Sequence, residues 1–220
     1  DKQAYDRGVS VFSPEGRIYQ VEYAREAVQN GSPTVGFQTE HGVVLAAIVP
    51  DNSSLKVTDS VRKIHKIEDS VCVGTTGYVG DGRRLVDDLR VSTQQNQLRY
   101  DEDPKISAVS KQIADHVHEV TQTGGHRPYG SSLIIGGVDS DGTSLYEVEP
   151  GGTPSEWLAV ANGRDRADYQ RYFEDNYSED YTVEELVSLA VEAFQEISSE
   201  EITETSVDVA SVDTESEQYY

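Results

Sequence analysis

The chain has 220 residues, which is enough for one compact domain with a sizeable core. Its 40 acidic and 18 basic residues give a net charge of −22, which excludes nucleic acid as a partner, because binding to a phosphate backbone depends on cationic groups. Cys72 is the only cysteine, so an intrachain disulfide is excluded and a reducing, cytoplasmic location is expected.

The first predicted element is a helix over residues 17–30. It follows a turn signal at 13–16, and its apolar residues Val21, Ala24 and Val28 recur at spacings of three and four. This spacing is typical of a short amphipathic helix that covers a core with one face.

Two β-rich runs come next, at 33–39 and 43–49, joined by a short turn that suits a hairpin. The second run is the longest wholly apolar stretch and stops at Pro50, far short of the roughly 20 residues that cross a bilayer. We therefore expect no membrane span. Further runs at 61–67 and 70–76 are predicted to extend the same sheet.

The rest of the chain alternates between helical and strand patterns. A capping box, Thr182-x-x-Glu185, marks the start of the last helix. The predicted helices are 79–100, 106–120, 165–176 and 182–197, and the predicted strands are 131–138, 144–148, 157–161 and 207–212.

This order of hairpins and paired helices predicts an α+β protein, a four-layer α-β-β-α sandwich of two antiparallel sheets over residues 33–213. No repeat or linker interrupts the sequence, so we expect a single domain over 1–220. Its C-terminal end is acidic: no Lys or Arg follows Arg171, and 15 acidic residues lie between Glu174 and Glu217. The acids are dispersed, which favours adaptation to high salt over a solvated face or a docking site for a basic partner.

The sequence does not match the patterns of a metal site, a phosphate-binding loop or a serine hydrolase. The only close histidine pair, His116 and His118, has a spacing that a helix points in different directions, so no metal site is expected. The glycines of 74–82 do not have the spacing of a phosphate-binding loop, and Gly130-Ser131 lacks the rest of a nucleophile elbow. We expect no cofactor and no serine-hydrolase triad.

Other segments carry a specific resemblance. Residues 5–7, 12–17 and 20–28 closely resemble the N-terminal signature of proteasome α-type subunits, and 81–86 and 125–130 resemble two further segments of that family. The resemblance covers essentially the whole chain and is nearest to archaeal subunits. It implies the N-terminal-nucleophile hydrolase fold and assembly with other α subunits into heptameric rings that cap the catalytic β rings.

The resemblance also implies that this chain is not an enzyme. Catalytic β subunits use an N-terminal Thr with a free amine, an acid and a Lys, and alignment places these positions at Ser32, Ile48 and Lys63. Ser32 has no free amine and Ile48 cannot ionise. The alternative hypothesis is a self-processing hydrolase that cleaves between Gly31 and Ser32 and uses Ser32 as its nucleophile.

Two functional groups of residues are implied by the family. Lys63, with walls at Gly31 and Tyr78, matches a pocket that receives the C-terminal carboxylate of an AAA ATPase regulator; the alternative for Lys63 is an ordinary surface charge. Residues 1–11 match a gate segment for unfolded substrates. The residues that match the axial gate, three of them within this segment, are Tyr5, Asp6, Arg7, Pro14 and Tyr23.

Two features depart from the family pattern. Tyr78 stands where a small apolar residue is common, so its ring is expected to narrow the pocket or to stack on an incoming aromatic residue. The apolar stretch 46–50 stands where the family usually carries Asp and basic residues. These departures favour a divergent second α subunit.

Overall fold

The computed structural model describes residues 8–49, 55, 57, 60, 62–100, 105–216 and 219–220. Its helices are α2 (Tyr19–Gln29), α3 (Val79–Tyr100), α4 (Ile106–Gln122), α5 (Arg166–Asn176) and α6 (Val183–Ile197). Its strands are β1 (Thr34–Thr39), β2 (Gly42–Ile48), β3 (Ile64–Glu68), β4 (Val71–Gly77), β5 (Ser131–Asp139), β6 (Gly142–Val148), β7 (Pro154–Glu156), β8 (Ala159–Asn162) and β9 (Val207–Asp213).

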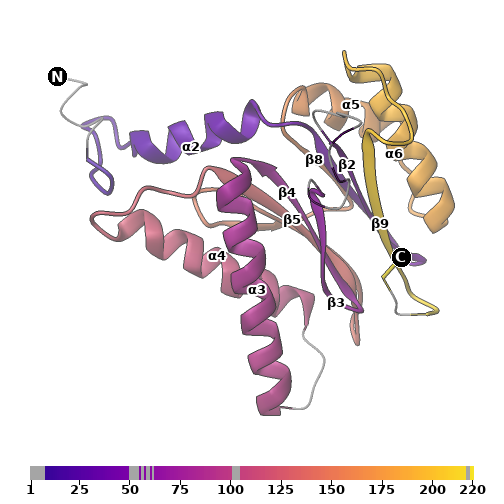
Figure 1. Cartoon of the computed structure of the whole chain (residues 1–220), viewed down its shortest axis with the longest axis horizontal. Helices are drawn as coiled ribbons and strands as arrows, with labels where there is room; N and C mark the ends of the chain where they lie inside the picture. Colours follow the sequence, from indigo (N-terminus) through magenta and orange to yellow (C-terminus); the bar gives the residue numbers. More distant parts are fainter. Residues whose placement is uncertain are drawn as a thin grey trace.

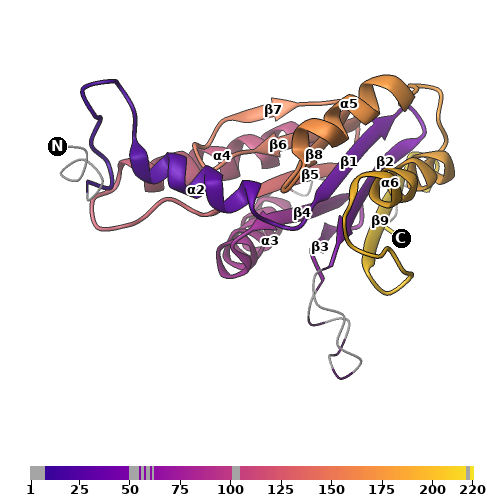
Figure 2. The same ribbon diagram turned by 90° about the horizontal axis from the view of Figure 1, so that it is seen from above.

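The strands form two antiparallel sheets, one with the order β8-β1-β2-β9 and one with the order β3-β4-β5-β6-β7. Helices α3 and α4 lie on the outer side of the five-stranded sheet, and α5 and α6 lie on the outer side of the four-stranded sheet (Figures 1 and 2). The predicted four-layer α-β-β-α sandwich is therefore confirmed.

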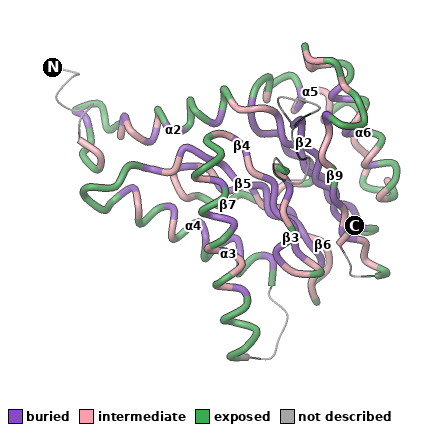
Figure 3. The backbone as a smooth tube through the Cα atoms, viewed as in Figure 1, coloured by how far each residue is buried: buried purple, intermediate pink, exposed green. Residues whose placement is uncertain are grey.

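Each boundary between layers has its own apolar core, and the buried residues concentrate in the strands and the inner helix faces (Figure 3). Phe37, Phe173 and Phe194 fill the core between the four-stranded sheet and its helices. Leu85, Leu89 and Val117 do so on the other side. The core between the two sheets contains Leu45, Cys72, Ile134, Leu145 and Val160.

The prediction that 61–67 and 70–76 extend the first sheet is wrong. They form β3 and β4, which join β5 in the five-stranded sheet. The alternation of side chains along β3 and β4 explains why these strands lie in the five-stranded sheet. Ile64 and Cys72 point between the two sheets, whereas Ile67 and Val71 pack against α3 and α4. A hydrophobic pattern of period two identifies a strand but not its neighbour.

The predicted strand 157–161 corresponds to β8, which begins two residues later, and the short strand β7 just before it was not predicted. Residues before Trp157 form β7 in one sheet, and residues after Leu158 form β8 in the other. The Trp157 amide donates to Leu145 in the five-stranded sheet (2.9 Å), and Leu158 accepts from the Gln38 amide in β1 (2.9 Å). The chain thus crosses between the sheets at Trp157, which packs in the core between them.

A buried polar network joins the two halves of the sandwich. Glu147 on β6 accepts two hydrogen bonds from the Arg166 guanidinium of α5, at 2.5 and 2.9 Å. Arg166 also donates to Asn162 on β8 at 3.0 Å, and Asn162 donates to Ser132 on β5 at 2.6 Å. Because Glu147 is buried, its charged carboxylate is stable in this position only when it is paired with the Arg166 guanidinium.

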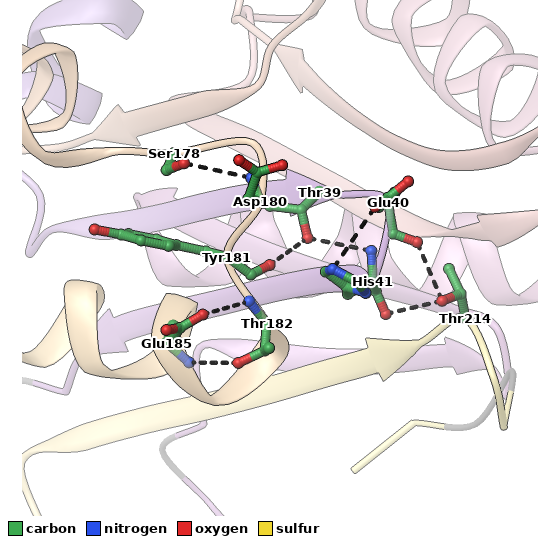
Figure 4. Close-up of polar contacts among 9 residues, drawn as sticks. All are labelled: Thr39, Glu40, His41, Ser178, Asp180, Tyr181, Thr182, Glu185 and Thr214. Atoms are coloured by element: carbon green, nitrogen blue, oxygen red, sulfur yellow. Dashed lines mark hydrogen bonds and ion pairs between the residues drawn. The ribbon is translucent and has the colours of Figure 1, made fainter.

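Hydrogen bonds fix the start of α6 against the β1–β2 hairpin (Figure 4). The predicted capping box is confirmed: the Glu185 amide donates to the Thr182 hydroxyl, and the Thr182 amide donates to the Glu185 carboxylate. The Thr39 hydroxyl donates to the Tyr181 carbonyl at 2.8 Å. On the other side of the hairpin, Thr214 donates to the His41 carbonyl, which ties the end of β9 to the same turn.

Helix α2 extends from the sandwich toward the N-terminal end (Figure 1). Its buried face consists of the predicted Val21, Ala24 and Val28, together with Tyr19. Among the helices of the described residues, none is both long enough and apolar enough to cross a lipid bilayer.

Candidate functional site

The segment just before β1 holds Ser32, which lacks the groups that would make it a nucleophile. Its hydroxyl donates to the Ile48 carbonyl at 2.6 Å, and its nitrogen lies in the peptide bond to Gly31. Ile48 is buried and has no ionisable group. Within the described part of the chain, Ser32 thus has no free amine of its own and position 48 offers no carboxylate to activate the hydroxyl.

Lys63 lies beside Ser32 with its ammonium group turned toward the backbone. Its Nζ donates to the Ser32 carbonyl at 2.5 Å and to the Pro33 carbonyl at 3.3 Å. Burial, reinforced by the nearby Arg164, lowers the pKa of Lys63 to about 7. Lys63 is thus not the ordinary surface charge of the alternative hypothesis, but a partly buried amine with two carbonyl acceptors.

Asp208 on β9 fixes the backbone at Lys63. One of its carboxylate oxygens accepts the amide hydrogens of Lys63 (3.0 Å) and Ile64 (2.9 Å). Since β9 and β3 belong to different sheets, this contact joins two edge strands across the sandwich. Sequence reasoning missed Asp208, because an acid in an alternating strand looks like an ordinary solvent-facing residue.

Lys63 lines a pocket of about 760 Å³ between β3, β4, the start of α3 and Tyr219. We call it the basic pocket, after its lining Arg62, Lys63, His65, Lys66, Arg83 and Arg90. Tyr78 lies at its rim and is 59% exposed. The predicted wall residue Gly31 precedes the lining residue Ser32 and packs closely on β4, since a Cβ on Gly31 would lie 2.8 Å from the Gly77 nitrogen.

Tyr78 is held in place by contacts between residues 81–86 and 125–130, the two further segments that resemble the family. The Asp81 carboxylate on α3 accepts both terminal nitrogens of Arg127 (2.6 and 2.9 Å) and the Gly130 amide (2.8 Å). The Arg127 guanidinium then lies 5.4 Å from the centre of the Tyr78 ring. This arrangement fixes the rim of the basic pocket through a bidentate ion pair and a cation–π contact.

The predicted gate residues are only partly within the described part of the chain: Tyr5, Asp6 and Arg7 lie outside it. Pro14 is exposed in a turn that the Ser13 and Arg17 backbones close at 2.8 Å. Tyr23 is 45% exposed on α2, and its ring stacks on that of Tyr19 with centroids 6.5 Å apart. Among the described residues, no group of three or more His, Cys, Asp and Glu has the arrangement of a metal site.

Comparison with known proteins matches both parts of the chain. Residues 5–27 match the N-terminal signature of A-type proteasome subunits, and residues 28–212 match the proteasome subunit family. Proteasome subunit alpha 1 of Haloferax volcanii is 47% identical over 218 residues, which cover 99% of this chain and 86% of the relative. The chain belongs to the proteasome α-subunit family.

Other α subunits are similarly related to the chain. Proteasome subunit alpha 2 of Haloferax volcanii is 49% identical over 214 residues, covering 96% of this chain and 86% of that protein. Proteasome subunit alpha 2 of Haloarcula marismortui is 45% identical over 219 residues, covering all of this chain and 90% of that protein. The resemblance seen in the motifs is thus confirmed, and membership of the family means assembly with other proteasome subunits in a core particle.

Proposed function

We propose that the chain is a non-catalytic subunit of the outer α ring of an archaeal proteasome core particle. In this role it assembles with other α subunits into a heptameric ring, contacts β subunits, admits unfolded proteins through a gate and docks an AAA ATPase regulator. The observation that carries the proposal is the match of residues 5–27 to the A-type N-terminal signature, joined to a Ser32 that has no activating groups. We place this particle in the cytoplasm.

The alternative function, a self-processing hydrolase, has no support in the site. Its nucleophile would be the Ser32 hydroxyl, whose hydrogen bond goes to a backbone carbonyl instead of a base. The amine of Lys63 lies nearby, but it donates to the Ser32 carbonyl oxygen. We therefore expect the threonine-type endopeptidase activity of the particle to reside in its β subunits.

The chemistry of Lys63 supports docking of a carboxylate. A charged ammonium has three hydrogens, and the Ser32 and Pro33 carbonyls accept two of them. The third remains to be donated to an incoming C-terminal carboxylate, whose negative charge would favour the protonated form of Lys63. Gly31 and Tyr78 form the wall and the rim beside it.

The docking role is tested with core particles that contain active β subunits and either wild-type chain or Lys63→Ala. We expect Lys63→Ala to lose ATPase-stimulated degradation of casein, while basal hydrolysis of small peptides stays the same. Lys111→Ala is the matched control, because Lys111 is an exposed lysine paired only with Asp115 on the same helix. Wild-type stimulation in the Lys63→Ala particle would refute the docking role.

The gate is tested in the same particles by two changes with opposite expected effects. Removing residues 1–11 takes away the segment proposed to block the axial pore and should raise casein degradation without a regulator. Tyr23→Ala removes an exposed ring proposed to hold the gate open, together with Pro14, Tyr5, Asp6 and Arg7, and should lower stimulated degradation. Equal rates in all three particles would remove the gate assignment.

A further inference from the structure

The basic pocket has a charge opposite to that of the protein. Acidic residues outnumber basic ones by 40 to 18 in the chain, yet the described residues that line this pocket include five Lys and Arg and no Asp or Glu. Arg83 and Arg90 come from α3, and Arg62 and Lys66 from the β3 side. Lys66 pairs with Asp69 and Arg90 with Asp87, but neither acid lines the pocket, and the positive charge of its lining favours an anionic ligand.

Tyr219 already occupies one side of this pocket. Its ring packs on the core between the sheets, and the Lys66 ammonium lies 5.8 Å from the ring centre. Arg62 forms a side-chain hydrogen bond with Tyr219, and burial raises the pKa of the Tyr219 phenol. Two of the pocket's cations therefore contact a residue of the chain itself.

Tyr219 and Tyr220 pair with the edge of β9. The Ser211 amide donates to the Tyr220 carbonyl at 3.0 Å, and the Tyr220 amide donates to the Ser211 carbonyl at 2.9 Å. A single β-bridge pairs Val212 with Tyr219. Consecutive residues of such a segment face opposite sides, so Tyr219 lines the basic pocket and Tyr220 lines a separate groove beside α6.

We propose that Tyr219 is a tethered competitor for the basic pocket, which an anionic peptide occupies fully only after the Tyr219 segment leaves the edge of β9. This inference rests on the proposed docking function and adds a regulatory step to it. The ligand it implies is a peptide with a free carboxylate, acidic side chains and an aromatic residue, which replaces the contacts of Arg62 and Lys66 with Tyr219.

The test is a binding measurement by fluorescence anisotropy with the purified protein. The probe is a labelled eight-residue peptide that carries a free C-terminal carboxylate, one tyrosine and two glutamates. Tyr219→Ser removes the competitor. A wild-type pocket that is open in about a tenth of the molecules binds the probe about tenfold more weakly than a pocket that is always open, so we expect the variant to bind about tenfold more tightly. Tyr220→Ser is the matched control and should bind like the wild type, since Tyr220 faces the other groove.

A second variant detaches the segment but leaves Tyr219 in the chain. Both backbone groups of Ser211 pair with Tyr220 and not with β2, so Ser211→Pro removes one tethering hydrogen bond at a strand edge. It should also tighten binding, and thermal melting of each variant verifies that it is folded. Equal affinity for the wild type, Tyr219→Ser and Ser211→Pro would overturn the competitor alone. Absence of binding by all of them would overturn the docking function as well.

Discussion

Replacing Lys63 by Met should change how the stability of the protein depends on pH. The substitution keeps the aliphatic stem of the side chain and removes the amine that contacts the Ser32 and Pro33 carbonyls. In the unfolded chain the lysine has its ordinary pKa of 10.5, whereas burial in the folded protein lowers the pKa of Lys63 to about 7. Between these values the unfolded chain binds the proton more tightly than the folded one.

The sign and size of the effect follow from proton linkage. Because the unfolded state binds more protons in this range, the free energy of unfolding rises as the pH increases from about 7, by up to about 1.4 kcal/mol per pH unit. Lys63 is partly exposed, and solvent screening reduces this slope. We expect wild-type protein to gain about 2 kcal/mol relative to Lys63→Met between about pH 7 and about pH 9.

The measurement is urea unfolding at several pH values in molar salt, followed by the fluorescence of Trp157, the only tryptophan, which packs between the sheets. Lys111→Met is the matched control, because it removes an exposed lysine that pairs with Asp115 on the same helix. A difference between wild type and Lys63→Met that stays constant from about pH 7 to about pH 9 would refute the view that folding buries this amine.

Three further predictions concern stability. Asp208→Ala should lower the free energy of unfolding by about 2 kcal/mol in urea titrations, since two amides lose their acceptor; a loss below about 0.5 kcal/mol would contradict this. Glu147→Ala should cost about 3 kcal/mol because it leaves the Arg166 guanidinium unpaired, whereas Glu149→Ala, at an exposed pair, should change little. Transfer from molar to low salt should lower the melting temperature, because the net charge of −22 is then less screened, and an unchanged value would count against salt adaptation.

Local patterns made most of the fold predictable. The capping box at Thr182 and Glu185 depends on residues three positions apart, and it occurs as predicted. The β-rich runs that became β1, β2, β5 and β6 were also recognisable, because a strand that buries one or both faces is rich in apolar residues. Sheet membership was not predictable in this way, since β3 and β4 have strand patterns that fit either sheet.

The functional site was predictable only as far as the family motifs reach. They indicated Lys63, Gly31 and Tyr78; Lys63 and Tyr78 line one pocket, and Gly31 lies next to its lining residue Ser32. The contacts of Asp208 and Tyr219 with this pocket join residues more than a hundred positions apart in the chain, so no local sequence pattern predicts them. The crossing at Trp157 escaped prediction for a similar reason, because it depends on partners in both sheets.

The central claim is that the chain is a non-catalytic subunit of an α ring and does not cleave itself before Ser32. Native mass spectrometry of the chain co-expressed with a β subunit, purified in high salt, tests it most directly. The account predicts particles whose outer rings contain seven α-type subunits, each with its N-terminal residues intact. A chain that begins at Ser32, or a particle in which this chain forms the inner catalytic rings, would contradict it.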